Sequence, residues 1–480
     1  MLNLKPEKVW YYFEEISEIP RCSGNEKGVR NYILEVADEA GLAARVDDAG
    51  NVLLKGGGRP DVVLQAHMDM VCEKNSGVDH DFEKDPIRLK EQDGWITAEG
   101  TTLGADNGIG VAIALAVATG DWGAGPVDCL FTVDEERGLN GATNLDPEFV
   151  RPERLINLDS EEFGVFTIGC AGGGKTKIEL PINTVTCNSR DRVRVSVQGL
   201  VGGHSGADID KGRANAIKLL TRVLKSLEDS SLKLVEISGG DKHNAIPREA
   251  SAVLLIDDEY AAIKGSLAER FSVFKAEYEE TEPEMNLEVE RLTEENKDCF
   301  SEESTLTLIN LIQALPNGVM AYDKKLESTV ETSTNLASVR VEDGTARLVM
   351  SSRSSRELKL ENLRKNRIEV IGESFGGEVS HKEAYPAWQP DRDSRLLEES
   401  KQVFRDLYGE NPEVKVIHGG LETGIIGEKK ESVEMIAVGP DVESPHSPEE
   451  RVNITSVEEF WHFLLGLLGE LRENGEQNDS

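Results

Sequence analysis

Histidine and carboxylate residues follow directly after apolar, strand-like segments of this chain or lie in turns beside them. They are His67, Asp69, Asp106, Glu135, Glu136, Asp159 and His446. Unpaired charges near a buried sheet edge are costly, and carboxylates that converge there repel one another unless a cation neutralises them. Imidazole and carboxylate together form the ligand set expected for Zn²⁺, Co²⁺ or Mn²⁺. Two histidines together with three to four of these five carboxylates exceed one tetrahedral site, so the pattern favours two divalent metal ions that share a bridging carboxylate.

Each of these residues has an ordinary explanation when it is taken alone. A carboxylate at the end of a strand usually caps a helix or lies in a solvated turn. A lone histidine is more often an ordinary residue than a ligand. The metal-site hypothesis therefore depends on the fold bringing the whole set together.

The segments that carry these residues predict an α/β domain. Strand-like runs at 61–70, 127–133, 155–158 and 433–438 alternate with helical patterns at 7–19, 26–40, 108–119 and 456–473. Such alternation is typical of a layered domain with a mostly parallel mixed sheet. In these sheets ligands bind at the carboxyl ends of the strands, which is where the polar side chains stand here.

Between these segments the pattern changes. From about residue 187, strictly alternating strands such as Arg192 to Val197 are combined with amphipathic helices, which predicts an α+β domain. After Tyr385 the α/β pattern returns. We therefore expect one domain formed by residues 1–186 and 386–480, with residues 187–385 inserted into it as a second domain.

Composition argues against several partners. The formal net charge of −36 over 480 residues disfavours nucleic acid, since a phosphate backbone requires basic patches, and it disfavours an anionic membrane surface. Solvation of the surface explains the acidity, with adaptation to high salt as a second interpretation. The N-terminal segment lacks the regions of a signal peptide, and no apolar run reaches the ~20 residues of a membrane span. Six scattered cysteines without CxxC pairs predict reduced thiols in a cytoplasmic protein rather than a disulfide framework.

The motifs HMD, GADNG, DEE, NLD and SPHS, in this order, resemble those of the clan of co-catalytic zinc peptidases and deacylases. That clan includes carboxypeptidase G, acetylornithine deacetylase and the bacterial dipeptidases. Longer segments, namely QAHMDMVCEK, TLGADNGIG, DEERGLNGA, INLDSEE, GGHSGADI, HGGLETG and SPHSPEER, resemble the aminoacyl-histidine (Xaa-His) dipeptidases along nearly the whole chain. The resemblance implies a three-layer α/β catalytic domain with an inserted α+β lid, and metal-dependent hydrolysis of dipeptides.

The same resemblance implies a ligand set for two divalent metal ions, Zn²⁺ first and Co²⁺ or Mn²⁺ as alternatives. His67 and Asp159 would hold one ion, Glu136 and His446 would hold the other, and Asp106 would bridge both.

Two further residues receive catalytic roles from the resemblance. Asp69, two residues past His67, would orient the His67 imidazole as an outer partner of the metal site. Glu135 would be the general base that takes a proton from a metal-bridging water and passes it to the leaving amine.

The resemblance also implies substrate contacts. His204, in the segment GGHSG, would stabilise the tetrahedral oxyanion. Asn244 and Arg353 would hold the substrate carboxylate, because the guanidinium fork binds carboxylates bidentately. Ser351 stands where many relatives have an aspartate two residues before that arginine. His418, expected in the catalytic domain, is a further candidate substrate contact.

Alternatives remain open from the sequence. A deacylase or an aminopeptidase of the same clan would carry nearly the same motifs, and a non-catalytic binding protein would have lost the base or a ligand. The sequence leaves undecided the preferred dipeptide, the native metal, and whether the chain forms a homodimer in which His204 serves a neighbouring active site.

Overall fold

The computed structural model describes residues 2–58, 60–122, 126–187, 191–227, 233–256, 259–292, 298–324, 328–382, 384–430 and 432–478. The chain divides into two compact units. Unit 1 comprises Met1–Cys170, Trp388–Val416 and Leu421–Ser480, and unit 2 comprises Ala171–Ala387 and Ile417–Gly420.

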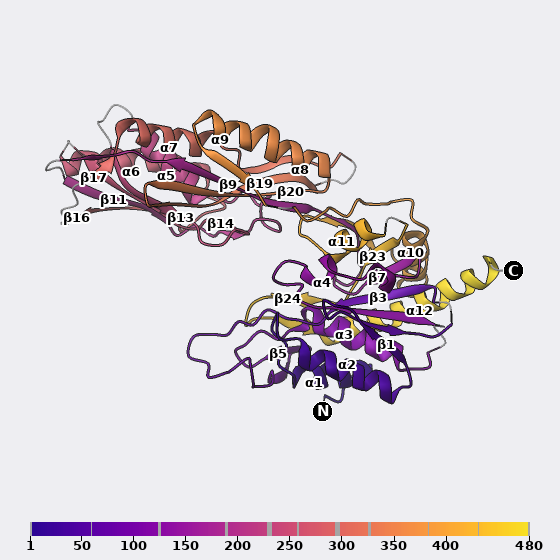
Figure 1. The fold of residues 1–480 in the computed structure, drawn as a ribbon. Helices are drawn as coiled ribbons and strands as arrows, with labels where there is room; N and C mark the ends of the chain where they lie inside the picture. Colours follow the sequence, from indigo (N-terminus) through magenta and orange to yellow (C-terminus); the bar gives the residue numbers. More distant parts are fainter. Residues whose placement is uncertain are drawn as a thin grey trace. The chain divides into compact units, whose positions relative to one another are not determined.

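Unit 1 contains a mixed eight-stranded sheet of order β1-β2-β6-β3-β7-β23-β8-β22 (Figure 1). Its strands are β1 (Ala43–Val46), β2 (Val52–Lys55), β3 (Val62–His67), β6 (Val127–Thr132), β7 (Arg154–Asn157), β8 (Val165–Cys170), β22 (Glu413–Ile417) and β23 (Glu434–Ala437). The central strands β6, β3, β7 and β23 run parallel. Every residue of β3 and β6 is buried, as expected for parallel strands covered on both faces.

Helices cover both faces of this sheet. The thiol of Cys129 in β6 contacts the carbonyl oxygen of Ala114 in α3, at 3.5 Å. Thr132, three residues further along β6, donates instead to Glu422 in α11, at 2.6 Å. Because side chains alternate along a strand, α3 and α11 lie on opposite faces, which confirms a layered α/β domain (Figure 1).

The remaining elements of unit 1 are helical or belong to a small four-stranded sheet of order β24-β25-β5-β4. The helices are α1 (Glu7–Ser17), α2 (Lys27–Glu39), α3 (Ala105–Ala118), α4 (Asn140–Thr143), the 3₁₀ turn η1 (Pro147–Phe149), α10 (Arg395–Tyr408), α11 (Glu422–Lys429) and α12 (Ile454–Asn478). The small sheet is formed by β4 (Leu89–Gln92), β5 (Trp95–Ala98), β24 (Val442–Glu443) and β25 (Arg451–Asn453).

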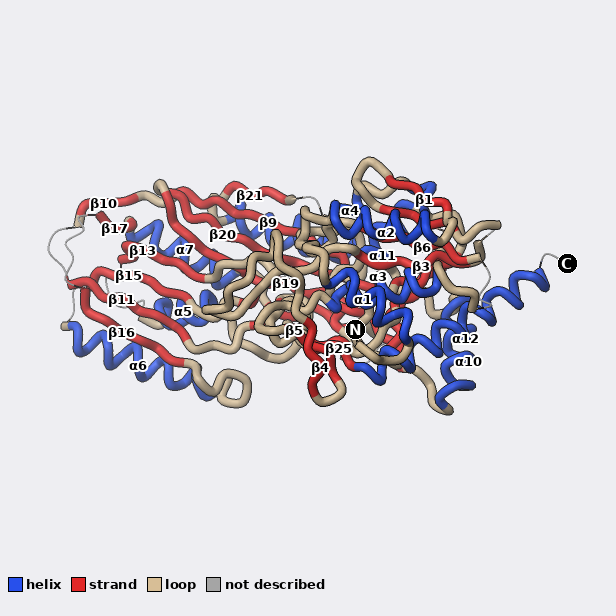
Figure 2. The backbone as a smooth tube through the Cα atoms, turned by 90° about the horizontal axis from the view of Figure 1, so that it is seen from below, coloured by secondary structure: helices blue, strands red, loops and turns tan. Residues whose placement is uncertain are grey.

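Unit 2 is built on a nine-stranded sheet of order β16-β11-β15-β13-β19-β20-β9-β21, with β18 paired to β19 (Figure 2). These strands are β9 (Gly172–Pro181), β11 (Asp191–Gln198), β13 (Lys233–Gly239), β15 (Ala250–Ile256), β16 (Asn286–Leu292), β18 (Gly318–Tyr322), β19 (Val330–Glu342), β20 (Thr345–Ser354) and β21 (Glu378–His381). Two short pairs join β10 (Thr184–Thr186) to β17 (Asp298–Phe300) and β12 (Gly203–His204) to β14 (Ala245–Ile246). The described pairings of the large sheet are antiparallel, in agreement with the predicted α+β class.

The helices of unit 2 share one hydrophobic core with its large sheet. They are α5 (Ala216–Lys225), α6 (Tyr260–Glu277), α7 (Glu302–Ala314), α8 (Glu357–Leu363), the π-helical turn η2 (Arg364–Glu369) and α9 (Val370–Ser374). The core joins side chains of α5 and α7, such as Leu220 and Leu308, to strand residues such as Val195, Leu254 and Leu348.

The observed division of the chain differs from the predicted domain limits. Unit 2 begins at Ala171 rather than at residue 187. The reason is β9, which pairs with β20 and β21 in the second sheet and so belongs to unit 2 throughout its length. Unit 2 also includes Ile417–Gly420, which the sequence placed in the catalytic domain.

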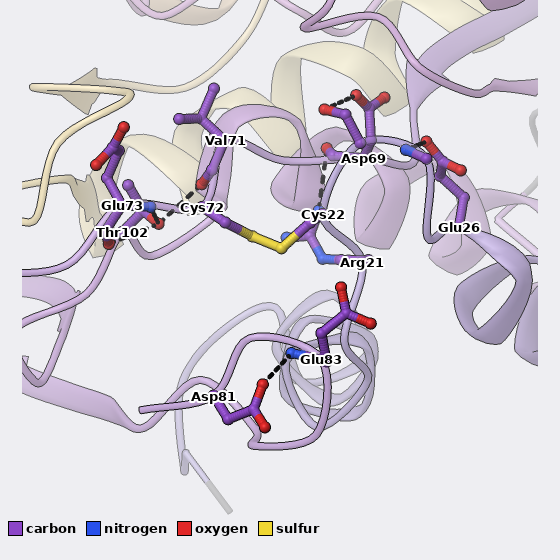
Figure 3. Close-up of a disulfide and its surroundings, with 12 residues drawn as sticks. Arg21, Cys22, Glu26, Asp69, Val71, Cys72, Glu73, Asp81, Glu83 and Thr102 are labelled. Atoms are coloured by element: carbon purple, nitrogen blue, oxygen red, sulfur yellow. Dashed lines mark hydrogen bonds between the residues drawn. A yellow bond between two sulfur atoms is a disulfide. The ribbon is translucent and has the colours of Figure 1, made fainter. Parts of the chain in front are cut away.

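The expectation of reduced cysteines is wrong for four of the six. Cys22 pairs with Cys72, and Cys187 pairs with Cys299, whereas Cys129 and Cys170 are buried free thiols. The fold brings each pair together. Cys22 forms an isolated backbone β-bridge with Met70, two residues before Cys72. Strand β10, which ends next to Cys187, pairs with β17, which contains Cys299. Figure 3 shows the Cys22–Cys72 disulfide, which joins the chain after α1 to the chain after β3. Among the described residues, no helix is both long and apolar enough to cross a membrane.

Candidate metal centre

The end of β3 presents two buried side chains. His67 is the last residue of the strand and is 1% exposed, and Asp69 follows it with no exposed surface. The His67 Nδ1 atom lies 3.1 Å from the Asp69 carbonyl oxygen and 3.5 Å from Asp69 Oδ1. Both contacts engage the same ring nitrogen, so His67 Nε2 is left to face the interior of the site.

The Asp69 carboxylate also holds the turn that carries the two glutamates. Its Oδ1 accepts from the backbone N–H of Glu135 at 3.0 Å, and its Oδ2 accepts from the N–H of Glu136 at 3.2 Å. The Ser23 hydroxyl donates to Oδ2 at 2.7 Å. Burial opposes ionisation of Asp69, but the contacts with His67, Ser23 and the backbone outweigh it and lower the Asp69 pKa to about 2. Asp69 is therefore a permanent anion that joins two parts of the site.

Asp106 lies at the start of α3, where the backbone is not yet helical. Its φ of −81° and ψ of 106° place it outside the helical region, and the Asp106–Asn107 peptide is cis. The Asn107 amide donates to the carbonyl oxygen of Leu158 at 2.7 Å, next to Asp159. A Cβ at Gly110 would lie 2.8 Å from that same oxygen, so only glycine permits this approach of α3 to the end of β7. The Asp106 and Asp159 loops are thus held against each other.

His446 comes from a loop with an unusual backbone. Both Ser444 and His446 have positive φ, at 53° and 61°, on either side of Pro445. Non-glycine residues rarely adopt this region, and the cost is tolerated mainly where it serves a site. The side chain of His446 is 52% exposed, in contrast with the buried His67.

These side chains form two groups around the Asp106 carboxylate. His67 Nε2 lies 3.0 Å from Asp106 Oδ1 and 3.5 Å from Asp159 Oδ1. On the other side, His446 Nε2 lies 3.1 Å from Asp106 Oδ2 and 3.0 Å from Glu136 Oε2. Within each group the candidate ligand atoms all lie within 4.8 Å of one another.

A further group with this spacing overlaps the two others. It consists of His67, Glu135 and Glu136, so Glu135 stands beside both of the main groups.

The charge balance of the site fits bound cations. Burial, followed by neighbouring carboxylates, raises the pKa of Glu136 to about 7 and raises those of Glu135 and Asp159. Burial alone would lower the pKa of His446, yet its contacts with Asp106 and Glu136 raise it to about 11. Protons on the imidazoles thus balance the carboxylates here, and metal ions take the place of such protons when they bind. The Glu136 Oε1 atom is buried and lacks a hydrogen-bond partner among the described residues, as expected for an acceptor oxygen that is available to a metal ion.

Two more glutamates lie near the centre, and the sequence analysis assigned neither. Glu422 is fully buried, whereas Glu161 is exposed to solvent. Burial raises the pKa of Glu422 to about 7. Glu422 Oε2 accepts from the Gln65 amide and the Thr132 hydroxyl, both at 2.6 Å. Their positions inside INLDSEE and HGGLETG were the only available signal, since a carboxylate in a motif does not reveal its burial.

The predicted substrate residues lie in unit 2, where His204 and Arg353 face each other. His204 Nδ1 accepts from the backbone N–H groups of Gly206 and Ala207, at 3.3 and 3.2 Å. The ring proton therefore resides on Nε2, which lies 3.4 Å from Arg353 Nη2. Both atoms are donors, so a carboxylate or carbonyl oxygen that lies beside the pair, within reach of both, would accept a hydrogen bond from each.

Arg353 is 8% exposed and is held by a residue that sequence reasoning missed. Its Nη1 donates to the Tyr385 hydroxyl oxygen at 2.8 Å, whereas its buried Nε lacks a partner among the described residues. A buried guanidinium with spare donors is suited to binding an anion. Tyr385 was noted in the sequence only as a domain limit, and nothing in its pattern indicated this contact.

His418 and Asn244 complete this group. The Ser333 hydroxyl lies 2.7 Å from His418 Nε2, and Ser333 is the partner of Arg353 in the β19–β20 register. Burial and the charge of Arg353 lower the His418 pKa to about 3, so this imidazole is neutral. The Asn244 carbonyl oxygen accepts from Ser205 N–H at 2.7 Å, beside His204. The predicted site residues are therefore distributed as one metal-type cluster in unit 1 and one donor-rich cluster in unit 2.

Comparison with known proteins finds peptidases at the level of family, sequence and structure. A family model described as Peptidase family M20/M25/M40 matches residues 63–470. The chain is 36% identical over 479 residues to the cytosol non-specific dipeptidase of Escherichia coli K12, covering 98% of each. The crystal structure of an aminoacylhistidine dipeptidase from Vibrio alginolyticus superposes with a TM-score of 0.83 at 36% identity over 97% of both chains. The aminopeptidase PepT of Bacillus cereus shares the fold alone, with a TM-score of 0.55 at 14% identity over 98% of this chain and 99% of that one.

Proposed function

Because this chain belongs to peptidase family M20/M25/M40, we propose that it is a dipeptidase that requires two divalent cations, with Zn²⁺ as the first choice and Co²⁺ or Mn²⁺ as alternatives. Its substrates are dipeptides, both Xaa-His and others. The names of the two 36% identical relatives, a non-specific dipeptidase and an aminoacylhistidine dipeptidase, support this substrate class. By the name of the Escherichia coli relative, the activity belongs in the cytoplasm.

One observation carries the proposal, namely the way the two oxygens of Asp106 are used. Oδ1 faces His67 at 3.0 Å, whereas Oδ2 faces His446 at 3.1 Å. Each oxygen thus belongs to a different imidazole–carboxylate group, which Asp159 completes on one side and Glu136 on the other. A carboxylate divided in this way is suited to bridge two cations, whereas a single cation would require only one of the groups.

The chemistry then follows from the groups that surround the bridge. Two divalent cations bound there would polarise the scissile carbonyl and lower the pKa of a water between them to near neutrality. Glu135 accepts the proton that this water loses and delivers it to the leaving amine nitrogen. Asp69 fixes both the His67 ring and the Glu135 backbone, so it sets the position of the base relative to a ligand.

Residues of unit 2 bind the ends of the substrate in this proposal. Arg353 offers its spare guanidinium N–H groups to the free carboxylate of the dipeptide, and Asn244 assists from the neighbouring turn. His204 donates its Nε2–H to the carbonyl oxygen of the scissile bond, where negative charge develops in the transition state. His418, held neutral beside Ser333, contacts the substrate without adding charge.

Metal dependence and substrate class are tested together. The full chain is stripped with a chelator, its metal content is measured, and a panel of free dipeptides is assayed before and after Zn²⁺, Co²⁺ or Mn²⁺ is restored. We expect activity to disappear and then return. Unchanged turnover after verified metal removal would contradict the proposal.

The same panel separates the dipeptidase from the other activities of this family. Each free dipeptide is paired with its C-terminal amide, with an N-acetylated amino acid and with a longer peptide of the same N-terminal residue. We expect the free dipeptides to have the highest kcat/KM, because a free carboxylate is part of the recognised group. Equal cleavage of amides or long peptides would favour an aminopeptidase, and preferred cleavage of the N-acetyl compounds would favour a deacylase.

A further inference from the structure

A buried carboxylate near His446 holds the loop that carries Asp106. Glu450 lies four residues after His446 and is 1% exposed. Its Oε2 accepts from the backbone N–H groups of Leu103 and Gly104, both at 2.8 Å. Its Oε1 accepts from the backbone N–H of Asp106 at 3.1 Å. One side chain thus satisfies three backbone donors that precede or begin α3.

These donors have few other ways to be satisfied. Asp106 is not helical, and Gly104 has a left-handed φ of 71°, so neither N–H belongs to a regular ladder. The first N–H groups of a helix have no partner within the helix, and an unpaired N–H in a buried position costs free energy. A carboxylate accepts several such bonds at once, and each is stronger than a neutral hydrogen bond. Glu450 therefore specifies the backbone position from which Asp106 projects.

A buried arginine also holds the same loop. Arg21, which Figure 3 shows next to the Cys22–Cys72 disulfide, is 2% exposed. Its Nη1 donates to the carbonyl oxygens of Met68 and Asp69, at 3.2 and 3.3 Å, and its Nη2 donates to the carbonyl oxygen of Gly104. A Cβ on Gly104 would lie 2.5 Å from Arg21 Nη2, so the close approach requires glycine. The loop after β3 and the Asp106 loop are thereby linked.

We propose that Glu450 is a positioning residue for the metal centre, acting through the backbone of Asp106. This inference rests on the proposed function, since it assumes that Asp106 bridges two cations. The two Asp106 oxygens face His67 and His446 at nearly equal distances of 3.0 and 3.1 Å. The Asp106 carboxylate can stay equally close to both histidines only if its position is fixed. The three hydrogen bonds to Glu450 fix the backbone of the loop that carries Asp106. Outer residues that orient metal ligands typically contribute ~10–100-fold to metal affinity or activity.

The location of Glu450 adds a second link. Glu450 and His446 belong to one short segment, so the residue that fixes the bridging ligand moves with a ligand of one of the two groups. Displacement of this segment would disturb the contacts of His446 and the backbone of Asp106 together.

The decisive variant is Glu450→Gln, made in the full chain. Its amide has one acceptor oxygen, so it cannot serve Leu103 and Gly104 through one atom and Asp106 through the other. We expect Co²⁺ affinity, measured by competition with a chromophoric chelator, to fall ~10–100-fold. We also expect a changed Co²⁺ absorption spectrum and, at saturating metal, a lower kcat with little change in KM, because the substrate contacts remain intact.

A matched control is Asp128→Asn. Asp128 is also fully buried, and its Oδ1 accepts from Gly56 N–H at 3.1 Å while its Oδ2 pairs with Arg151 at 2.7 Å. It lies near the start of β6, at the opposite end of the strand from Glu135. The Asp128→Asn variant should have a lower melting temperature but an unaltered Co²⁺ affinity and spectrum. A purely structural role for Glu450 would give the same result for both variants.

A second variant keeps the test decisive if Glu450→Gln does not fold. Glu450→Asp retains the buried charge but is one methylene shorter, so it pulls on the Asp106 loop. We expect it to fold and to weaken Co²⁺ binding to an intermediate degree. Wild-type affinity and spectrum in a folded Glu450 variant would overturn the positioning role. Failure of the wild-type chain to bind Co²⁺ would instead overturn the proposed metal site.

Discussion

Replacement of Asp69 by asparagine tests how the two halves of the metal centre are joined. The Asp69 oxygens accept from Glu135 N–H at 3.0 Å and from Glu136 N–H at 3.2 Å, on different atoms. An asparagine has one acceptor oxygen, so its NH₂ group must face one of these two backbone N–H groups. The variant therefore loses at least one charge-assisted hydrogen bond and places two donors against each other in a buried position.

The size of the effect follows from these contacts. A hydrogen bond to a charged group contributes about 1.5–3 kcal/mol, so we expect Asp69→Asn to lower the free energy of unfolding by about 2 kcal/mol. For a unit of this size that corresponds to a fall in melting temperature of about 4–8 °C. Because the turn that carries Glu135 is loosened, we also expect kcat at saturating metal to fall ~10–100-fold.

The assay combines thermal unfolding with steady-state hydrolysis of a free dipeptide. Ser23→Ala is the matched control, because it removes the 2.7 Å contact to Asp69 Oδ2 and leaves both turn contacts in place. That control should also lose about 2 kcal/mol of stability, because it too removes a hydrogen bond to a charged group, but it should keep its kcat. A wild-type kcat in Asp69→Asn, or an equal loss of kcat in Ser23→Ala, would refute the idea that Asp69 acts through the turn.

Three further predictions concern the base, the carboxylate site and a disulfide. Glu135→Gln should keep both metal ions and lose ~10²–10⁴-fold in turnover, because a general base is separate from the ligands, whereas Glu136→Gln should lose metal. Arg353→Ala should abolish the preference for free dipeptides over their amides, with Arg347→Ala on the same strand as the control, since Arg347 is exposed and pairs with Glu179 and Glu342. Cys72→Ser should destabilise unit 1 by about 4 kcal/mol, the value expected for opening a loop with a sequence separation of 50 residues.

Each of these predictions has a contrary result that is easy to recognise. Metal analysis that finds an empty position in Glu135→Gln would make Glu135 a ligand. A retained amide discrimination in Arg353→Ala would place the carboxylate site elsewhere. Titration of the unfolded, unreduced chain should detect only the two thiols of Cys129 and Cys170, and detection of six would remove the basis of the disulfide prediction.

The candidate metal ligands were recognisable in the sequence for a physical reason. His67 ends β3, whereas Glu136 and Asp159 follow β6 and β7, and these three strands are adjacent and parallel. The carboxyl ends of such strands meet at one edge of a sheet, so residues distant in the sequence are close by topology. Asp106 and His446 come from loops, and only the order of motifs linked them to this edge.

Other features could not be read from the sequence. The disulfide partners are 50 and 112 residues apart, and strand pairings that a composition of scattered cysteines does not reveal bring them together. The limit at Ala171 depends on β9 pairing with β20 and β21, and the assignment of His418 to unit 2 depends on contacts such as that with Ser333. Each of these features depends on which distant segments of the chain pair with one another, and the local sequence pattern does not specify that pairing.

By itself, the sequence supplied the candidates proposed to carry the chemistry, because residue type, position after a buried strand and the order of motifs can all be read along the chain. Tertiary structure alone decided what holds those side chains in place. Glu450 and Arg21 act on backbone N–H and carbonyl groups of the Asp106 loop, and every residue type has such groups. Their direction is set only when the chain is folded, so a side chain that binds backbone leaves no mark in the sequence of the residues it binds.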